Sequence, residues 1–421
     1  MSSSITSSSS CNPVFLRNNQ LRLLSLPEQI GVYHIDIDLT LDCNLRCIYC
    51  FKSEKVREHI QERVAYDAVV WFLYATSTQN RLSIALMGGE PLTNFSLIKK
   101  WIPFVKRRTQ QHGKEVRISM TTNCTLVTNE VIEFWKKWEL FFHTSIDGIP
   151  EVQNVNRPTV LGGPSAHLVE NGVKKILKDF PETTARCTVV PETVAHVAEG
   201  YSYFRNLGYT DIAMIPADFD RWNAKSIEIY EEQFMLISKL WVEDIQKGQS
   251  WIALKNIDDY LGRQKFQQKL PSVPCGAGTA MLSIDIHGNI WPCSRMTKHK
   301  NDWCLGSIYG HFNDGLRKHF INGRPEERDS EECVNCVANG MCGGGCQAEN
   351  LDCIGDIYGM HPNRCEMSRI WARAGKYAHD VLYDTKNPLL LKKYYPQEWR
   401  SLYEKSTVED RGASDLQLEV G

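Results

Sequence analysis

The sequence lacks the features of a membrane, secreted or nucleic-acid-binding protein. No apolar run approaches the roughly 18 residues that cross a bilayer, and the longest candidate, Val69–Tyr74, is short. The net charge is only −2, which gives no global attraction to nucleic acid or to an anionic membrane. The first ten residues, MSSSITSSSS, have neither the basic start nor the apolar core of a signal peptide. We therefore expect a disordered serine-rich tail and a cytoplasmic protein.

What the chain has in excess is cysteine, with 15 in 421 residues. In a reducing compartment, clustered cysteines indicate metal binding rather than disulfides. One cluster, Cys43, Cys47 and Cys50, has the spacing C-x3-C-x2-C, and the other fills the last third of the chain. The isolated Cys11, Cys124 and Cys187 fit small buried hydrophobic residues.

The first cluster offers only three thiolates, with no fourth cysteine or histidine close by. A structural zinc site takes four protein ligands. Three thiolates would leave one iron of a [4Fe–4S] cluster without a protein ligand, and that iron could bind a small molecule. The odd number of ligands therefore predicts a reactive iron–sulfur cluster.

Strand and helix patterns alternate over the first half of the chain. Alternating residues predict a strand at 33–39 and further strands at 82–86, 115–120, 141–146, 185–190 and 211–215. Helical segments are predicted at 61–77, 94–110, 128–138, 166–179 and 194–206. Six such units predict an α/β protein with a partial (β/α)6 TIM-type barrel, whose chemistry collects where strands end. The conspicuous segments lie there: Cys43–Cys50, Gly88–Pro91, Asn123, Ser145–Gly148 and Pro191.

Periodicity and cysteine content change along the chain and predict five regions. Residues 1–30 are a tail and lead-in, 31–221 the partial barrel, and 222–271 a helical connector. Residues 272–370 form a cysteine-rich iron–sulfur domain with little periodicity, and 371–421 a C-terminal helix and tail. Because the cysteine-rich region would bury little apolar area, we expect bound clusters to organise it.

Residues 40–51, TLDCNLRCIYCF, resemble the signature of the radical S-adenosylmethionine (SAM) enzymes, and Gly88-Gly89-Glu90-Pro91 resembles the GGEP motif of that family. The resemblance implies that Cys43, Cys47 and Cys50 hold a [4Fe–4S] cluster that binds SAM. Further residues match family positions that contact SAM: Gly88, Gly89 and Glu90 at its amino group, Tyr49 along the adenine, Asn123 and Ser145 on the ribose and carboxylate side, and Arg186 at the carboxylate. Each also has an ordinary interpretation, such as a tight turn or a surface cation.

The cysteine-rich region resembles the SPASM extension of the same superfamily. Its pattern, C-x(9–15)-G-x4-C followed by C-x2-C-x5-C-x3-C and a last cysteine, is filled at all seven cysteine positions. The resemblance implies two auxiliary [4Fe–4S] clusters. The outer one would be held by Cys333, Cys336, Cys342 and Cys365, and the inner one by Cys275, Cys293 and Cys346.

The inner cluster would then be one ligand short. Cys304 could supply it, or the iron could stay open to a substrate thiolate. For Cys353, three roles stay open: a cluster ligand, a substrate relay and a core residue.

SPASM proteins mostly modify peptides. The segments CGGGCQAEN (342–350) and GDIY (355–358) look like those of maturases of ribosomally made peptides. The resemblance implies reductive cleavage of SAM to a 5′-deoxyadenosyl radical, which abstracts hydrogen from a precursor peptide and leads to a thioether or carbon–carbon crosslink.

Three alternatives stay open: a sulfatase-type formylglycine maturase, a radical SAM enzyme that acts on a small molecule or decarboxylates a peptide, and an iron–sulfur electron-transfer protein. Two departures count against the first. Ser294 and Arg295 follow Cys293 where sulfatase maturases have an acidic residue, and Gln153-Asn154 stands where they tend to have His-Asp.

The implied partners are a precursor peptide and a reductant such as flavodoxin or ferredoxin, with no nucleic acid and no membrane. The 42 residues before Cys43 are too few for a leader-binding domain. We therefore expect leader recognition by a separate protein, by residues 222–270 or by an exposed strand edge.

Overall fold

The computed structural model describes residues 30–404, except 53–54, 77–78, 218, 249, 267–274, 300–301 and 323–330. The predicted serine-rich tail and Cys11 lie outside these residues. Within them, no helix combines the length and the apolarity needed to cross a bilayer.

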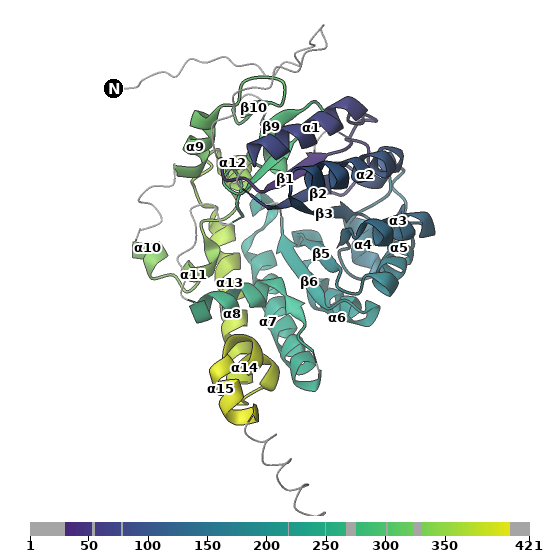
Figure 1. The fold of residues 1–421 in the computed structure, drawn as a ribbon. Coiled ribbons are helices and arrows are strands. Elements are labelled where there is room, and N and C mark those ends of the chain that lie inside the picture. The colour runs from purple at the N-terminus through teal and green to yellow at the C-terminus, as the bar shows by residue number, and fades with distance from the viewer. Residues whose placement is uncertain are drawn as a thin grey trace, which may run out of the picture.

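A ten-stranded sheet forms the centre of the molecule (Figure 1). Its strand order is β10-β9-β8-β1-β2-β3-β4-β5-β6-β7. Strands β1 to β6 follow their sequence order and pair in parallel, which confirms the predicted parallel α/β core. The six strands are His34–Asp38, Arg81–Met87, Glu115–Thr122, Phe141–Ser145, Thr184–Val189 and Asp211–Pro216.

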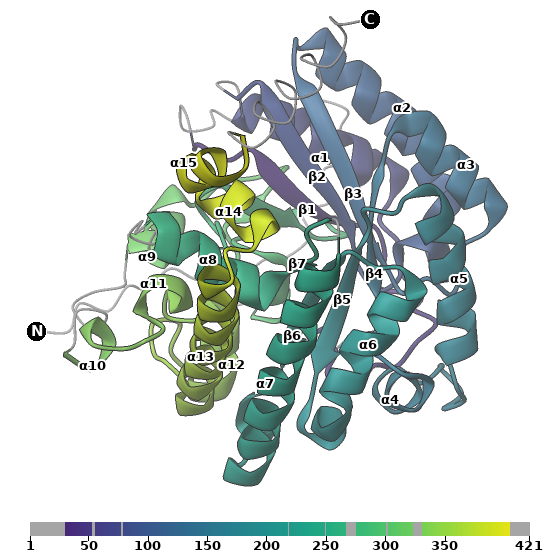
Figure 2. The same ribbon diagram turned by 90° about the horizontal axis from the view of Figure 1, so that it is seen from below.

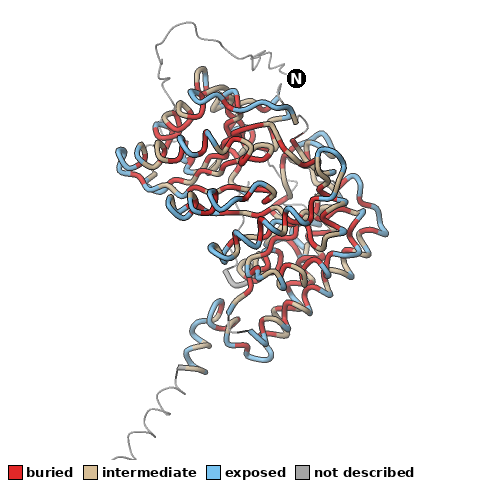
Figure 3. The backbone as a smooth tube through the Cα atoms, turned by 90° about the vertical axis from the view of Figure 1, so that its right-hand side faces the viewer, coloured by how far each residue is buried: buried red, intermediate tan, exposed pale blue. Residues whose placement is uncertain are grey.

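Helices follow the first five of these strands and cover one face of the curved sheet (Figure 2). Buried and exposed residues alternate along them, as in amphipathic helices (Figure 3). The six helices and their 3-10 leads are α1 Glu62–Ala75, η1 Pro91–Asn94 with α2 Phe95–Gln111, α3 Asn129–Trp138, α4 Pro150–Asn156 with α5 Ala166–Asp179, and η2 Pro191–His196 with α6 Val197–Leu207.

The two faces of the parallel sheet differ in polarity because side chains alternate along each strand. The face toward the helices carries Ile35, Ile84 and Ile118, all fully buried. The opposite face, called here the inner face, carries polar residues brought together by register. Thr121 is opposite His143, His143 is opposite Thr184, and Ser145 is opposite Arg186. A polar inner face is suited to a ligand rather than to a closed apolar barrel core.

The predicted connector, residues 222–271, contains α7 Ala224–Lys247, the short edge strand β7 Ala253–Leu254 and α8 Lys255–Phe266, and η3 Phe219–Arg221 lies just before it. A capping box between Asn223 and Ser226 starts α7. Helix α13, Pro362–Asp384, runs alongside α7 (Figure 2). The Trp371 indole donates a hydrogen bond to the Tyr230 hydroxyl at 2.7 Å and joins the two helices.

The cysteine-rich region continues the barrel sheet instead of forming a sheet of its own. Strand β8, Met281–Ile284, pairs in parallel with β1, and β9 Asn289–Trp291 and β10 Gly306–Ser307 extend it antiparallel. Leu282, Ile284 and Ile290 are fully buried. Strands this short leave no detectable periodicity in a sequence. The remaining elements are η4 Ser294–Lys298, α9 Asp314–Asn322, α10 Glu331–Val334, α11 Asn339–Cys342, α12 Gln347–Ile354, α14 Pro388–Tyr394, α15 Pro396–Trp399 and η6 Arg400–Glu404.

Close packing of α5 predicts that Gly172→Ala destabilises the fold. A Cβ at Gly172 would lie 1.9 Å from the carbonyl oxygen of Cys124, in the loop that follows β3. We expect urea unfolding of the apo protein to show a loss of about 1–3 kcal/mol, the usual cost of overpacking. Gly262, in α8, is the matched control because nothing lies within 4 Å of its added Cβ. Gly262→Ala should gain up to about 1 kcal/mol from helix propensity. Equal effects at the two positions would contradict this packing.

Candidate active site

The three N-terminal cysteines lie in residues 39–60, called here the cysteine loop, which joins β1 to α1. Its ends are closed by backbone hydrogen bonds, from Ile60 to Leu39 at 3.0 Å and from Leu41 to Glu58 at 2.8 Å. Its middle pairs with residues 156–158, through Arg46 N to Pro158 O at 2.8 Å and Ile48 N to Asn156 O at 3.0 Å.

The thiols of the cysteine loop are neighbours. Burial raises the pKa of Cys43 to about 11, and Cys47 also contributes. Burial likewise raises the pKa of Cys47, with a contribution from Cys50. Among the residues with described positions, no three Cys, His, Asp or Glu side chains converge on a single metal ion. A four-iron cluster, whose ligands attach at separate corners, needs a wider arrangement than one ion does. Three neighbouring thiols are thus the donor set that such a cluster requires.

Residues 88–90 rest directly on the cysteine loop. Gly89 N donates to Thr40 O at 2.8 Å, and Glu90 N donates to Asp42 O at 2.8 Å. A Cβ at Gly88 would lie 2.2 Å from Thr40 O, and Gly88 has a φ of +133°. The sequence predicts that these glycines let the backbone approach a ligand. In the structure, the close approach that requires glycine is to the cysteine loop itself.

Glu90 joins the ends of β2 and β3 beneath this contact. Its carboxylate, which is 1% exposed, accepts hydrogen bonds from Leu92 N at 3.1 Å, the Thr122 hydroxyl at 2.8 Å and Asn123 N at 2.7 Å. Burial raises the pKa of Glu90 to about 7, against the lowering effect of these hydrogen bonds. The Asn123 amide donates to Asn44 at 2.9 Å and lies 3.9 Å from Cys43 Sγ. Glu90 and Asn123, two predicted site residues, therefore support Cys43.

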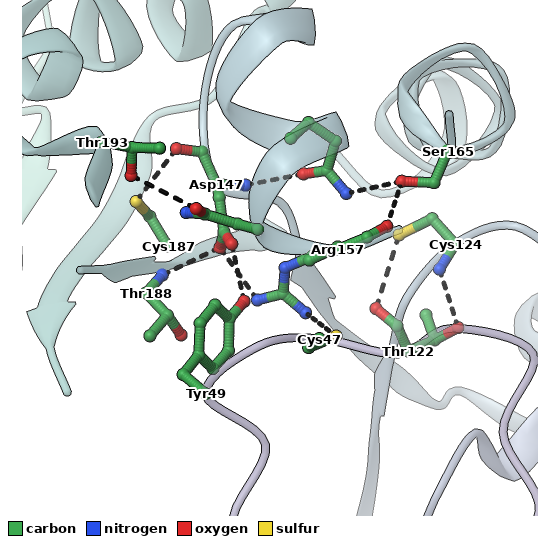
Figure 4. A network of polar contacts seen from close by, with 12 residues as sticks. Cys47, Tyr49, Thr122, Cys124, Asp147, Arg157, Ser165, Cys187, Thr188 and Thr193 are labelled. Carbon is green, nitrogen blue, oxygen red and sulfur yellow. Dashed lines mark hydrogen bonds and ion pairs between the residues drawn. The ribbon is translucent and has the colours of Figure 1, made fainter. Parts of the chain in front are cut away.

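A buried network fixes Tyr49 (Figure 4). The Tyr49 hydroxyl donates to Asp147 Oδ2 at 2.6 Å, and Arg157 pairs with Asp147 Oδ1 at 2.9 Å. Arg157 Nη1 lies 3.9 Å from Cys47 Sγ, and its guanidinium is 5.2 Å from the Tyr49 ring centroid. Burial and the negative charge of Asp147 raise the pKa of Tyr49 well above its usual range, so the hydroxyl keeps its proton and donates. The network holds the aromatic ring between Cys47 and Cys50 in one orientation.

Sequence reasoning missed Asp147 and Arg157. It selected Ser145 from the segment SIDG, although Asp147 belongs to the same segment. Ser145 lies on the inner face opposite Arg186. Arg186 interacts electrostatically with Asp36 and Asp211. Among the described residues, no hydrogen bond or ion pair joins Arg186 to the cysteine loop. The cation that contacts this loop near Cys47 is Arg157.

The C-terminal cysteines lie near other cysteines. Burial raises the pKa of Cys293 to about 12, with contributions from Cys346 and Cys275. Burial raises the pKa of Cys365 to about 11, with contributions from Cys342, Cys333 and Cys336. The electrostatic neighbours thus fall into two groups: the inner set Cys275, Cys293 and Cys346, and the outer set Cys333, Cys336, Cys342 and Cys365.

The two undecided cysteines lie in different surroundings. Cys304 packs against the apolar cluster around Trp291 and Phe320, which also contacts Cys293 and Cys346 of the inner set. Cys353 instead lies beside Asp220. Burial and a hydrogen bond with Asp220 raise the pKa of Cys353 to about 12.

Residues that follow Cys50 contact residues that follow Cys293, so the cysteine loop touches the region of the inner set. Lys52 forms a buried ion pair with Asp38 and lies 3.5 Å from the Thr297 hydroxyl. The Arg295 guanidinium is 5.4 Å from the Phe51 ring centroid. These long-range contacts have no signal in the sequence.

Loss of either charge of the Asp147–Arg157 pair should destabilise the protein strongly, because the side chains are 0% and 8% exposed. We expect Arg157→Met and Asp147→Asn each to cost about 3–5 kcal/mol, since each leaves a buried charge unpaired. The double variant should cost clearly less than the sum, as measured by denaturant unfolding of the apo proteins. The exposed pair Lys247–Glu243 is the control. Lys247→Met should cost less than about 1 kcal/mol. Strict additivity at Asp147 and Arg157 would show that the two charges do not support each other.

Comparison with known proteins agrees with this geometry. The radical SAM superfamily model matches residues 37–203. A cysteine-type anaerobic sulfatase-maturating enzyme of Clostridium perfringens is 24% identical over 332 residues, which are 72% of this chain and 86% of the relative.

Solved structures share the fold. The structure of anSMEcpe with bound AdoMet and Cp18Cys peptide has a TM-score of 0.70 at 21% identity, over 84% of this chain and 99% of that one. Streptococcus suis SuiB bound to its precursor peptide SuiA has a TM-score of 0.56 at 13% identity, over 79% of this chain and 76% of that one.

The resemblance seen in the sequence is confirmed. The matched residues include the cysteine loop, the Gly88–Glu90 segment and the Asp147–Arg157 network. Residues 37–203 of this chain form a radical SAM domain, which marks the chain as an enzyme.

Proposed function

We propose that this enzyme modifies a peptide by abstracting hydrogen from one of its residues and forming a thioether or carbon–carbon crosslink between side chains. The observation that carries the proposal is the three-thiol cysteine loop beside the buried Tyr49–Asp147–Arg157 network, at the carboxyl ends of strands with a polar inner face. The relatives named above, one that matures sulfatases and one with a bound precursor peptide, support a peptide as the substrate.

Cys43, Cys47 and Cys50 would hold a [4Fe–4S] cluster with one iron left for SAM. Once SAM is bound and the cluster is reduced, the cluster and SAM together would supply a 5′-deoxyadenosyl radical, which removes hydrogen from an unactivated C–H bond. Tyr49, held by Asp147, would orient the adenine, and Gly88, Gly89 and Glu90 would face the amino group. Asn123 and Ser145 would lie toward the ribose and carboxylate, with Arg186 as the predicted carboxylate contact. The chain's own task is to orient these groups and exclude water.

The inner and outer cysteine sets would hold two auxiliary [4Fe–4S] clusters. Their mutual pKa effects support this division, because thiols that raise one another's pKa lie close together. The auxiliary clusters would accept the electron that product formation releases. A flavodoxin or ferredoxin is the proposed reductant.

Formylglycine formation on a sulfatase is the second candidate, and the identity to sulfatase-maturating enzymes favours it. Against it, the residues that follow Cys293 carry no acid. Arg295 lies there instead, 3.6 Å from Glu349 and close to the Phe51 ring. A base for formylglycine formation would have to come from another part of the chain.

Cys43→Ala tests the proposed chemistry. Under anaerobic reduction, we expect the variant to form at least about 100-fold less 5′-deoxyadenosine from SAM than the wild type, because the cluster loses a ligand. Cys124→Ala, at another buried cysteine, is the control and should keep activity. Thermal unfolding checks that both variants fold. Undiminished SAM cleavage by Cys43→Ala would refute the proposal.

Iron content tests the auxiliary sets. Three four-iron clusters give about twelve irons per chain, and Cys342→Ala should leave about eight. Cys353→Ala should keep about twelve, because Asp220 is the group that hydrogen-bonds this thiol. A loss of about four irons from Cys353→Ala would instead make Cys353 a cluster ligand.

A further inference from the structure

Exposed apolar side chains lie around residues 44–48 of the cysteine loop. Their exposed fractions run from 36% to 96%, and we call them the exposed patch: Leu126, Ile48, Val160, Val155 and Leu161. Ile48 N donates to Asn156 O at 3.0 Å, and Val160 N donates to Asn44 O at 3.2 Å. The Asn44 side chain donates to the Thr125 hydroxyl at 2.7 Å, next to Leu126. One exposed apolar residue is ordinary, whereas several gathered on one surface indicate an interaction site.

The exposed patch is close to thiols that would hold the SAM-binding cluster. Arg157, which lies between Val155 and Val160 in the chain, reaches to within 3.9 Å of Cys47 Sγ (Figure 4). Ile48 directly follows Cys47. In a four-iron cluster with three thiol ligands, the free iron is the corner that no thiol holds, so SAM would bind on the side away from the loop. A protein on the exposed patch would therefore approach the cluster from its thiol side, without blocking SAM or a peptide.

Two cations without an acidic partner lie beside the exposed patch. Arg46 and Lys55 donate hydrogen bonds to the backbone carbonyl oxygens of residues 43 and 45, at 2.8–3.3 Å. In the part of the chain that the structure describes, neither side chain forms an ion pair. Helix α4 contributes one acid, Glu151, one turn before Val155. Together these three side chains carry a net positive charge, which attracts an acidic partner.

We infer that the exposed patch docks a flavodoxin, which delivers the electron for SAM cleavage. Flavodoxins are acidic and expose an apolar edge of their flavin, which complements an apolar centre with cations at its rim. The size of the patch also fits, because electron-transfer complexes are weak and bury small interfaces. The anionic flavin hydroquinone would give one electron to the oxidised cluster and become the neutral semiquinone, with no proton transferred. This inference rests on the proposed radical SAM chemistry and assigns a surface to its reductant.

Charge substitution in the exposed patch tests the docking with two readouts. The first is binding of oxidised flavodoxin to the apo protein, measured by isothermal titration calorimetry. The second is formation of 5′-deoxyadenosine from SAM by the reconstituted enzyme, driven either by flavodoxin hydroquinone or by dithionite. We expect Leu161→Glu and Val155→Glu each to weaken binding and slow the flavodoxin-driven reaction at least about fivefold, because each places an acid against an acidic partner. The dithionite-driven reaction should stay within about twofold of wild type, since a small reductant needs no docked complex.

Two further variants are the controls. Leu236→Glu makes the same change at an apolar side chain of α7 that is 44% exposed, and it should alter neither readout. Leu161→Lys should weaken flavodoxin binding less than Leu161→Glu does, because the new charge is then attracted to the partner. Thermal unfolding checks that all variants fold.

Flavodoxin binding that is absent in the wild type, or unchanged in Leu161→Glu and Val155→Glu, would overturn the docking surface. An equal loss in Leu236→Glu would also overturn it, because the effect would then follow net charge alone. A patch on which a ferredoxin-driven reaction depends, and the flavodoxin-driven one does not, would assign the surface to ferredoxin instead. The proposed function fails separately, if the wild type forms no 5′-deoxyadenosine with dithionite.

Discussion

The docking of residues 88–90 on the cysteine loop is the contact on which the active site depends. Two backbone hydrogen bonds hold Gly89 and Glu90 against Thr40 and Asp42. A side chain at Gly88 or Gly89 would collide with the backbone of the cysteine loop. Once this contact forms, Glu90 reaches the amides of the next strand end, and Asn123 approaches Cys43. A loop whose three cysteines would otherwise move independently is thus fixed to the ends of β1, β2 and β3.

Positive charge is divided between two places in the barrel. Arg157 is balanced by Asp147 in a fully formed buried pair, and its role is to hold Tyr49 beside Cys47. Arg186 lies opposite Ser145 on the inner face and interacts electrostatically with Asp36 and Asp211.

Most of the fold core could be predicted from the sequence because the strands and helices of residues 33–216 are long enough to show their periods. The short strands β8, β9 and β10 could not, since two to four residues have no measurable alternation. The cysteine loop was recognisable because its ligands are adjacent in sequence. Asp147 and Arg157 were missed because the residues that they contact in the cysteine loop, Tyr49 and Cys47, lie 98 and 110 residues earlier in the chain. The contacts of Arg295 with Glu349 and Phe51 likewise join segments that only folding brings together. Gly88 and Gly89 were identified for a ligand contact, while the structure uses them first to pack two loops.

The central claim is that the cysteine loop holds a cluster that binds SAM, whereas the inner and outer cysteine sets hold auxiliary clusters that do not. Electron paramagnetic resonance of the reduced, reconstituted protein during titration with SAM tests this claim most directly. The account predicts that the signal of one cluster in three changes its g-values at one equivalent of SAM. This change should be absent in Cys43→Ala and present in Cys342→Ala. A spectrum that SAM leaves unchanged, in a protein that carries its full iron, would contradict the account.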